Sequence, residues 1–403
     1  MEPYLDESHL RLKAAVRRFG LERVVPVARE LDETSTFPWQ NVKEMGDRGW
    51  LGVPWPRELS GMGLDYLSYI VVVEELARHD ASHAITVSAH TTLGTSPIVH
   101  FGTDEQRERF VPLLASGQVL GGFGLTEPGA GSDAAGTATR AERRTDGYAI
   151  TGSKIFITNG GVGEIFVITA RTSAGEGHGG ISSFVVCKPT ADPEGAARVG
   201  VGHRPELPYS DGITAGACED KLGWRASDTR ELHLRDVRVG PGQLLGEEGL
   251  GFANFMRTLD SGRIGVAALS LGIAQGALDV ALAYAVRRRQ FGRPIWDRQE
   301  IRFGLAEVAA QVQGARHLTY HAAWLKDRGR PFGKEAAMAK LTSAALAASA
   351  TRRAVQCLGG AGYTSDYPVE RMMRDAKACE IGEGTPEIQK LVISRHLLEG
   401  MEG

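Results

Sequence analysis

The run Ile381–Gln389 near the C-terminus contains a carboxylate in a setting suited to chemistry, because Glu383 stands between Gly382 and Gly384. Glycine has no side chain, so the main chain on both sides leaves this carboxylate room to lean over a planar ligand. A general base needs such an open position beside the proton that it removes. Glu383 is therefore the first candidate catalytic residue.

The same run also predicts the start of a helix. Thr385 can serve as the N-cap, Pro386 suits the first helical position, and Glu387 in the first turn complements the helix dipole. Most carboxylates near helix starts have only this structural role. The two interpretations are compatible, since Glu383 precedes the predicted cap.

A second candidate site is the glycine-rich run Gly124–Asp133, which carries hydroxyl groups at Thr126 and Ser132. Its backbone N–H groups can face a phosphate or the polar edge of a ring. The stretch Gly129–Ala134 also satisfies the dinucleotide pattern GxGxxA. That pattern has meaning between a strand and a helix, whereas strand-like segments follow it here, so a plain tight turn stays an open alternative.

Length and charge limit the class of protein. A chain of 403 residues exceeds one ordinary hydrophobic core, so two or three domains are expected. Its 46 basic and 49 acidic residues give a formal net charge of −3, which offers no electrostatic case for nucleic acid or an anionic membrane as a partner. The four cysteines form no CxxC pair and no metal-ligand spacing with histidine, so no metal site is expected.

The chain shows no sign of a targeting or membrane segment. We find no apolar run that approaches the roughly 20 residues needed to cross a bilayer. The N-terminal residues Met1–Glu7 carry early acids and no apolar core, unlike a signal or transit peptide. We therefore expect a cytoplasmic protein with no membrane partner.

The spacing of apolar residues divides the chain into three parts and predicts an α+β multidomain fold. Residues 1–119 have helical spacing and form the expected N-terminal helical domain. Residues 120–240 hold short β-branched and aromatic runs between turns, which predict a central antiparallel β domain with a long excursion at 194–220. Residues 241–403 form the expected C-terminal helical bundle, with alanine-rich helices at about 263–290, 299–327 and 334–358.

Five segments occur in a fixed order along the chain: Gly124–Asp133 with Gly136, Lys221–Arg225, Leu259–Gly265, Arg288–Gly292, and Gln356–Tyr363 continuing through Asp366, Arg371 and Asp375. Together they resemble the recognition segments of the acyl-CoA dehydrogenase family, in particular its short-chain and branched-chain members. The resemblance extends over essentially residues 5 to 398.

This resemblance implies a homotetramer of three-domain subunits, with FAD held between the β domain and a C-terminal four-helix bundle. One set of residues would contact the flavin or its pyrophosphate: Phe123, Leu125, Thr126, Ser132, Phe156 and Thr158. A second set would reach the FAD of a neighbouring subunit: Arg288, Phe291, Gln356 and Gly360. Thr385 and Glu387 would touch the same cofactor near the base. Many members have tryptophan where this chain has Phe156.

Arg288 belongs to the basic run Arg287–Arg289, which without a family context is typical of a solvated helix face. A buried pyrophosphate would supply the missing anion. The planar guanidinium group of Arg288 would bind it with several donors, which lysine cannot reproduce.

The implied reaction removes the α-proton of an acyl-CoA thioester and transfers the β-hydrogen as hydride to the flavin, which gives the trans-2-enoyl-CoA. Glu383 occupies the base position of the family. Some relatives carry the base on the segment Leu259–Arg263, but the corresponding residue here is Gly262. Substrate contacts are expected from Ser132, Asp260, Arg263, Gly382 and Gly384. Asp260 and Arg263 also suit an ordinary intrahelical pair.

Two departures from the family pattern concern the substrate. Gly382 stands where many straight-chain members have tyrosine, which implies a wider acyl pocket, and no arginine lies near Ala84 to hold a dicarboxylyl-CoA. Electrons would pass to an electron-transferring flavoprotein, within fatty acid or branched-chain amino acid catabolism. Two alternatives stay open: an acyl-CoA oxidase that uses O2, and a flavin-fold relative without dehydrogenase activity. The acyl chain itself is not specified by the pattern.

Overall fold

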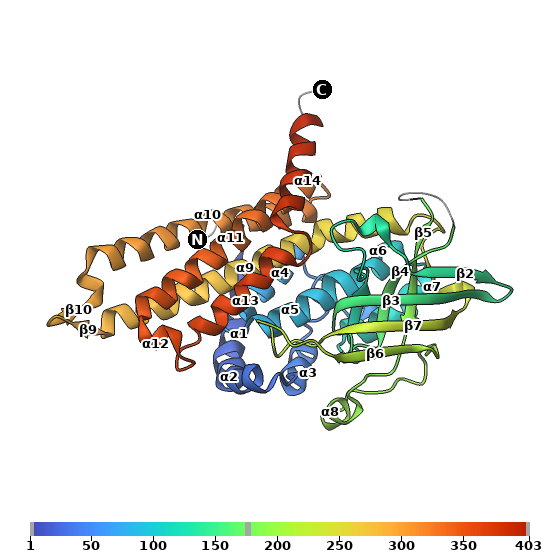
Figure 1. Cartoon of the computed structure of the whole chain (residues 1–403), viewed down its shortest axis with the longest axis horizontal. Helices are drawn as coiled ribbons and strands as arrows, with labels where there is room; N and C mark the ends of the chain where they lie inside the picture. The colour runs from blue at the N-terminus through green and yellow to red at the C-terminus, as the bar shows by residue number, and fades with distance from the viewer. Residues whose placement is uncertain (1–3, 174–178, 400–403) are drawn as a thin grey trace.

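The structure, a computed structural model, describes residues 4–173 and 179–399. Helices come first, a sheet follows and helices return, with the sheet at one end of the molecule and the long helices extending away from it (Figure 1). The N-terminal helices are α1 (Glu7–Phe19), η1 (Gly20–Val24), α2 (Val25–Thr34), α3 (Trp39–Asp47), η2 (Arg57–Leu59), α4 (Tyr66–Ala77), α5 (Ala81–Ser88), η3 (Ala89–Thr95), α6 (Ser96–Phe101) and α7 (Asp104–Ala115).

Side-chain caps fix the starts of several of these helices. Asp6 accepts from the backbone N–H groups of Ser8 and His9 at the start of α1, and Asp65 caps α4 by accepting from the backbone N–H of Ser68. His9 also bonds to Asp65 through Nε2, at 3.0 Å. The starts of α1 and α4 are therefore tied to each other.

The central part forms one sheet with the strand order β6-β7-β3-β2-β4-β5-β8 and β1 paired to β4. Its strands are β1 (Gly121–Gly124), β2 (Arg140–Arg144), β3 (Gly147–Thr158), β4 (Ile165–Arg171), β5 (Ile181–Cys187), β6 (Ile213–Cys218), β7 (Thr229–Val239) and β8 (Leu244–Leu245). The pairing is antiparallel except that β1 runs parallel to β4 and one residue pair joins β2 to β4 in parallel. The short η4 (Ala134–Gly136) and then β2 follow the glycine-rich loop, so this loop does not belong to a βαβ unit.

The predicted excursion at 194–220 contains regular structure. A short helix, α8 (Pro193–Arg198), opens it, and β6 near its end pairs with β7 as the edge strand of the sheet. β8 comes after residue 240 and pairs with β5, so the segment that leads into the C-terminal helices also contributes to the sheet.

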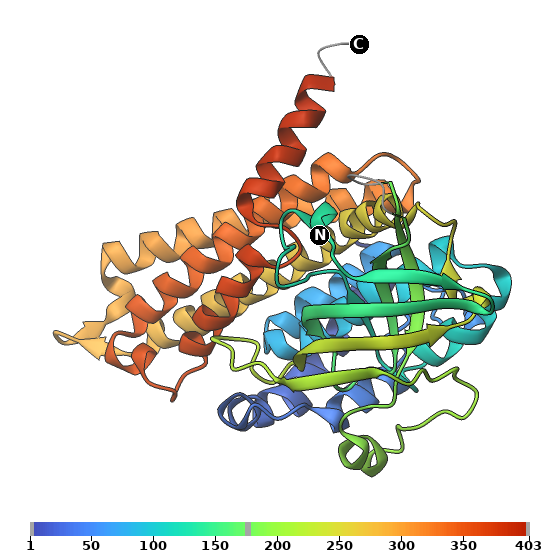
Figure 2. The same ribbon diagram turned by 45° about the vertical axis from the view of Figure 1, so that its right-hand side comes forward.

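Four helices form the C-terminal bundle: α9 (Gly251–Arg287), α10 (Gln299–Asp327), α11 (Gly333–Leu358) and α13 (Val369–Ile381). The connections hold η5 (Pro241–Gln243), β9 (Arg289–Gln290), β10 (Arg293–Pro294), η6 (Ile295–Asp297) and α12 (Gly360–Tyr363). The last helix, α14 (Pro386–Glu399), packs on α11 with its first turns and then projects from the bundle (Figure 2). The helix start predicted at Pro386 is confirmed.

The alanine pattern located α10 and α11 within a residue, but α9 begins at Gly251 rather than near 263. The reason is composition, since residues 251–262 of α9 contain a single alanine, Ala253, among larger and polar residues such as Phe252 and Arg257. α9 is also long and apolar enough to pass for a membrane span, contrary to the expectation that no such run exists. Most of its apolar window is buried inside the protein, which is the setting of a core helix.

Glycines let α9 lie directly against α4. A Cβ added at Gly272 would overlap the carbonyl oxygen of Glu74, and one at Gly276 would overlap that of Arg78. One hydrophobic cluster accordingly contains buried residues of both helices, such as Val72 of α4 and Leu269 of α9. The N-terminal helices and the bundle therefore share a core. The sheet contributes to two further clusters, one with α6 and α7 and one of its own.

A buried charge cluster lies in this shared core. Glu74 of α4 accepts from Arg316 of α10 at 2.8 Å and from the Tyr320 hydroxyl at 2.6 Å. Burial raises the pKa of Glu74, but Arg316 and Lys13 outweigh it, so the pKa lies below its usual range. Arg316 also donates to Gln275 of α9 at 2.9 Å. The cluster thus links the N-terminal helices to the bundle.

We predict that Arg316→Met lowers the free energy of unfolding by about 3 kcal/mol, because it leaves the Glu74 carboxylate buried with too little positive charge. Urea denaturation at fixed FAD concentration measures the loss. The matched control is Arg29→Ala, which removes an exposed pair with Glu33 and should cost less than about 1 kcal/mol. Equal losses in the two variants would show that the cluster does not stabilise the shared core.

Candidate active site

Glu383 lies in a tight turn between α13 and α14, and its strained backbone conformation determines where its side chain points. Its φ is +54°, in the left-handed region that a glutamate rarely adopts. Gly384 follows with φ +99°, a value that only glycine takes without strain. Residues in such conformations persist only where their surroundings hold them, and they cluster at functional sites.

Two side chains hold this turn through its carbonyl groups. Lys340 of α11 donates from Nζ to the carbonyl oxygens of Glu380, at 3.2 Å, and Gly384, at 2.6 Å. Gln389 of α14 donates from Nε2 to the carbonyl oxygens of Gly384, at 2.9 Å, and Glu383, at 3.2 Å. The main chain is thus fastened on both sides of the base, while the Glu383 side chain is left free.

The Glu383 carboxylate is buried and unpaired. Both oxygens are inaccessible to solvent, although the residue as a whole is half-buried, and neither bonds to any residue in the described part of the chain. Burial raises the pKa of this carboxyl to about 7, against the lowering effect of Lys340 and Arg263. A carboxylate with this pKa accepts a proton near neutral pH, as a general base must.

Gly262 of α9 provides the space for this carboxylate. A Cβ added at Gly262 would overlap Oε2 of Glu383. A side chain at residue 262 and the carboxylate of residue 383 would therefore compete for one position. This geometry is compatible with the expectation from sequence that Glu383 has no rival on α9.

Asp260 and Arg263 lie within one turn of Gly262 and form the intrahelical ion pair considered from the sequence, through Arg263 Nη1 and Asp260 Oδ1. Arg263 is only 1% exposed, and its Nε has no hydrogen-bond partner among the described residues. Burial raises the pKa of the Asp260 carboxyl, with Arg263 acting in the opposite direction. Both residues are beside the base, and their contact with substrate stays a prediction.

Two tyrosines of α4 border the site and were missed from the sequence. Tyr66 and Tyr69 are buried with ring centroids 5.0 Å apart. The Tyr66 hydroxyl donates to the carbonyl oxygen of Ser261 at 2.7 Å, and the Tyr69 hydroxyl donates to Ser88 at 3.1 Å. Burial raises the pKa of both tyrosines, and the Glu383 carboxylate adds to this rise. Their helical spacing gave no signal beyond that of core residues.

The position before the base has room for a side chain. Gly382 has φ −61°, an ordinary value, and a Cβ there would lie 3.5 Å from the Ala378 carbonyl oxygen and 4.0 Å from the Trp224 ring. Trp224 therefore borders the space beside Gly382. The wider acyl pocket expected from Gly382 stays a prediction.

The first group of predicted flavin residues begins on β1. The Phe123 ring stacks on Phe255 of α9 with centroids 5.7 Å apart. In the loop that follows, Leu125 and Thr126 are half-buried and Ser132 is exposed. The contact of Phe123 with Phe255 joins β1 to α9, whose later turns carry Gly262.

A buried ion pair holds the loop after β1 against the sheet. Lys154 of β3 bonds to Glu127 at 2.6 Å and to the carbonyl oxygen of Leu125 at 3.1 Å. Glu127 in turn accepts from the backbone N–H groups of Ala138, at 2.7 Å, and Thr139, at 3.2 Å. The pair thereby closes the loop on itself, a role that the glycine pattern did not reveal.

Phe156 stands at a bulge in β3. The pairing of β3 with β7 slips between Lys154 and Ile157, and Phe156 has φ +58°. A bulge of this kind re-aims a side chain out of the regular alternation. Phe156 is accordingly 63% exposed, whereas Thr158, paired with Thr229, is half-buried.

The second group of predicted flavin residues lies apart from the first. Arg288 and Phe291 follow the end of α9, and Gln356 and Gly360 flank the end of α11, at the end of the bundle remote from the sheet (Figure 1). All four are exposed, and Phe291 is 91% exposed with φ +52°. One chain does not bring the two groups together.

Thr385 and Glu387 lie directly after the base, at the start of α14. Glu387 is exposed, and its pKa is lowered by its own backbone N–H and by the Thr385 hydroxyl. Thr385 directly precedes α14 and Glu387 lies in its first turn, the positions expected from the sequence, and their contact with a cofactor stays a prediction.

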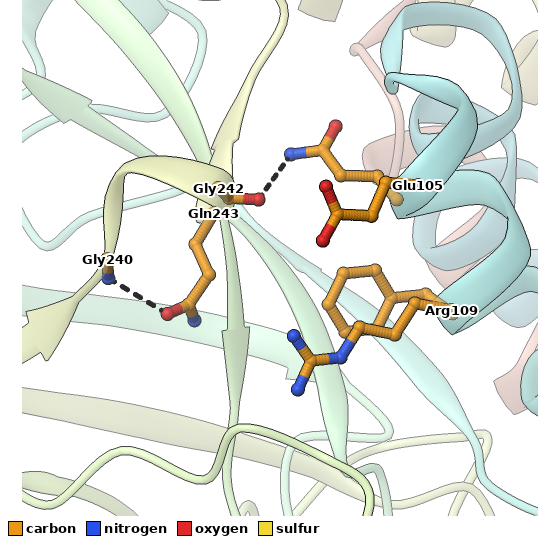
Figure 3. A pocket seen from close by; sticks show the side chains of 7 residues that line it. Glu105, Arg109, Gly240, Gly242 and Gln243 are labelled. Carbon is orange, nitrogen blue, oxygen red and sulfur yellow. Dashed lines mark hydrogen bonds between the residues drawn. The ribbon is translucent and has the colours of Figure 1, made fainter.

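A separate cavity of about 150 Å³ lies between α7 and the turn that precedes β8 (Figure 3). Glu105 and Arg109 of α7 and Gln243 of the turn contribute side chains to it. Gln106 donates to the Gly242 carbonyl oxygen at 2.8 Å, so this wall joins the N-terminal helices to the sheet. The cavity contains none of the predicted site residues.

We predict that Glu383→Gln stabilises the protein in a pH-dependent way. The folded pKa of about 7 exceeds the usual 4.5, so the folded state binds the proton more tightly and the wild type loses stability as pH rises from about 4.5 to 7. The neutral amide avoids this loss. The variant should gain up to about 3 kcal/mol at pH 8 and almost nothing at pH 4.

Urea denaturation at the two pH values measures this gain, with the exposed neighbour Glu387→Gln as the control that should show none. A gain that does not depend on pH would mean that Glu383 is solvated in the folded protein.

Comparison with known proteins places this geometry in a family. Three family profiles match: Acyl-CoA dehydrogenase, N-terminal domain, at residues 6–118; middle domain, at residues 122–237; and C-terminal domain, at residues 249–398. The short-chain specific acyl-CoA dehydrogenase of Clostridium acetobutylicum is 46% identical over 383 residues, which cover 95% of this chain and 96% of the relative.

Solved structures agree with this match. Butyryl-CoA dehydrogenase from Megasphaera elsdenii superimposes with a TM-score of 0.91 at 42% identity, over 99% of this chain and 100% of that one. A chain described with the electron-transferring flavoprotein of Acidaminococcus fermentans gives a TM-score of 0.92 at 42% identity, over the same shares. With a buried, unpaired glutamate at the expected base position, this chain belongs to the acyl-CoA dehydrogenase family.

Proposed function

We propose that this acyl-CoA dehydrogenase acts on short acyl-CoA thioesters and uses Glu383 as its base. The observation that carries the proposal is the buried, unpaired carboxylate of Glu383, whose pKa burial raises to about 7. The α-proton of a thioester is weakly acidic, so a base of ordinary glutamate strength removes it poorly. Desolvation makes this carboxylate a stronger base than an exposed one.

The reaction converts the acyl-CoA to the trans-2-enoyl-CoA. When bound, FAD accepts the β-hydrogen as hydride. Glu383 takes the α-proton on its carboxylate, and Gly262 leaves that carboxylate room to reach the substrate. Tyr66 and Tyr69 exclude water from the neighbourhood of the base, which preserves its raised proton affinity.

The residues around the site fit FAD. The hydroxyl groups of Thr126, Ser132 and Thr158 bond to no residue that the structure describes, so they are available to the polar groups of a ligand. Phe156 offers an exposed ring at its bulge, an apolar surface of the kind that a flavin ring covers. These are the residues that would hold the ring and pyrophosphate.

Two observations support a short acyl chain. The relatives described above are a short-chain specific enzyme and a butyryl-CoA dehydrogenase. In this chain, a Cβ at Gly265 would lie 2.9 Å from the Tyr69 hydroxyl, so α9 and α4 are in close contact one helical turn from Gly262. The space beside the base is therefore limited in that direction, whereas Gly382 leaves room on the side of Trp224.

The separation of the two groups of flavin residues supports a homotetramer. Arg288 and Phe291 are exposed at the end of the bundle remote from the sheet, whereas the first group lies on the sheet and the loop after β1. In the proposed assembly they reach the FAD of a neighbouring subunit. An electron-transferring flavoprotein is the proposed electron acceptor, and it would dock transiently, as redox partners usually do.

We predict that Glu383→Gln retains FAD but loses nearly all dehydrogenation of butyryl-CoA, because the amide cannot accept a proton. Stopped-flow bleaching of the flavin measures the rate, and a series of acyl-CoA chain lengths with the wild type identifies the substrate. Retained turnover within a few-fold of wild type would remove Glu383 from the mechanism.

The electron acceptor separates a dehydrogenase from an oxidase. The wild-type enzyme should reduce the electron-transferring flavoprotein much faster than it reduces O2. The reverse ranking would favour the acyl-CoA oxidase.

We predict that Arg288→Ala weakens FAD retention and assembly together, since loss of a charged donor leaves pyrophosphate oxygens unpaired at a cost of a few kcal/mol. Gel filtration with measurement of FAD occupancy, followed by thermal melting, tests this. Arg287→Ala removes the adjacent charge and is the matched control. Full occupancy and a wild-type melting temperature for Arg288→Ala would make Arg288 a plain surface charge.

A further inference from the structure

Three buried lysines stand out among the described residues: Lys154, Lys188 and Lys340. Lys154 pairs with a carboxylate, as described above. Lys188 and Lys340 instead direct their ammonium groups at backbone carbonyl oxygens. Burying a lysine is costly, so each needs a reason. For Lys340 the reason is that its two acceptor residues lie on either side of Glu383.

The carbonyl groups that Lys340 binds come just before and just after the base. Glu380 is near the end of α13, and Gly384 follows Glu383 directly. Between these two acceptors the chain turns through the left-handed conformation of Glu383. One ammonium group that binds both carbonyl oxygens holds them close together. This contact keeps Glu383 in its left-handed conformation, from which the strained backbone would otherwise relax.

Lys340 also brings positive charge to the base. The groups that face Glu383 are Lys340 from α11, Arg263 from α9, and Tyr66 and Tyr69 from α4. The charge of Arg263 is offset by its ion pair with Asp260. The hydrogen bonds of Lys340 go to the neutral carbonyl groups of Glu380 and Gly384, so no bonded carboxylate among the described residues offsets its charge.

Other groups surround Lys340 itself. They are Cys379 and Glu380 of α13, Arg263 of α9, Glu387 of α14 and Glu383. The carboxylates among them are not hydrogen-bonded to its ammonium group through their side chains. The base is thus next to a cation that hydrogen bonds hold in place.

We propose that Lys340 is the positioning residue for Glu383, because its ammonium group fixes the left-handed turn that presents the carboxylate and favours the ionised form of that carboxylate. This inference rests on the proposed role of Glu383 as the base. It assigns Lys340 no contact with substrate or cofactor.

The first test is Lys340→Met in the FAD-bound enzyme. The rate of flavin reduction by butyryl-CoA at pH 7 should fall by about tenfold or more. The rising limb of the pH profile should move to higher pH by about one unit, because loss of a nearby positive charge disfavours the carboxylate. Backbone amides of residues 380–389 should exchange with deuterium faster than in the wild type.

Lys340→Arg separates the two effects. It keeps the charge but cannot place one donor atom between the two carbonyl groups, so the rate should fall while the rising limb stays in place. If Lys340→Met does not fold, Lys340→Arg alone tests the proposal. Lys188→Met is the matched control, since Lys188 is equally buried on carbonyl oxygens and burial lowers its pKa to about 8, as for Lys340. It should melt at a lower temperature yet keep the wild-type pH profile.

A folded Lys340→Met enzyme with the wild-type rising limb and wild-type exchange at 380–389 would overturn the proposal. So would a Lys340→Arg enzyme with wild-type rate and exchange if the methionine variant is unfolded. In either case an inactive Glu383→Gln enzyme would still support Glu383 as the base. An active Glu383→Gln enzyme would instead refute the proposed function itself.

Discussion

The buried, unpaired carboxylate of Glu383 is the constraint on which the rest of this structure depends. An ionised carboxylate without a hydrogen bond in a desolvated position is unfavourable, and burial accordingly raises the pKa of this carboxyl to about 7. No side chain in the described part of the structure donates a hydrogen bond to this carboxylate. Lys340 and Gln389 donate instead to main-chain carbonyl groups around Glu383, so the carboxylate keeps its raised proton affinity.

Each structural part contributes to keeping the base in this state. α13, which leads into the base, is tied to the N-terminal helices by Arg371 with Asp80, at 3.4 Å. It is tied to the middle domain by Asp375, which accepts from the Trp224 backbone N–H at 2.6 Å. Since strain at a single residue survives only in a well-determined setting, the contact of all three parts with α13 explains how the turn is maintained.

Close packing of glycine and alanine is the second requirement. Gly262 leaves the volume that the carboxylate fills, and Gly272 lets α9 lie against α4, which carries the two tyrosines beside the base. The contribution of α9 to the site is therefore mainly the absence of side chains at Gly262 and Gly272. Such close approach also explains why the N-terminal helices and the bundle share one core rather than forming separate ones.

The sequence predicted the elements with strong local patterns. Alanine periodicity located α10 and α11, β-branched and aromatic runs indicated the central sheet at 120–240, and the glycines around Glu383 identified the candidate base. Local pattern could not reveal side chains whose role depends on tertiary contact. Lys340 is one of two lysines in the alanine-rich helix α11, and Tyr66 has the spacing of a core residue. The roles of both residues can be recognised only in the folded protein, where α11 and α4 lie beside the turn at Glu383.

The flavin residues show the same limit. The family resemblance divided them into two sets, and their positions form two groups at different ends of the bundle. Composition and spacing alone, without the resemblance, give no such division. The bulge at Phe156 is similarly a property of pairing between β3 and β7, which neither strand encodes alone.

A direct titration of the Glu383 carboxyl group tests whether it is desolvated and has a raised pKa. Infrared difference spectra of the FAD-bound enzyme, with and without ¹³C-labelled glutamate, follow the protonated carboxyl band as pH is varied. A desolvated Glu383 should give a band that titrates with a midpoint of about 7 and is absent from Glu383→Gln. A Glu383 carboxyl that is already fully ionised at pH 5 would contradict it.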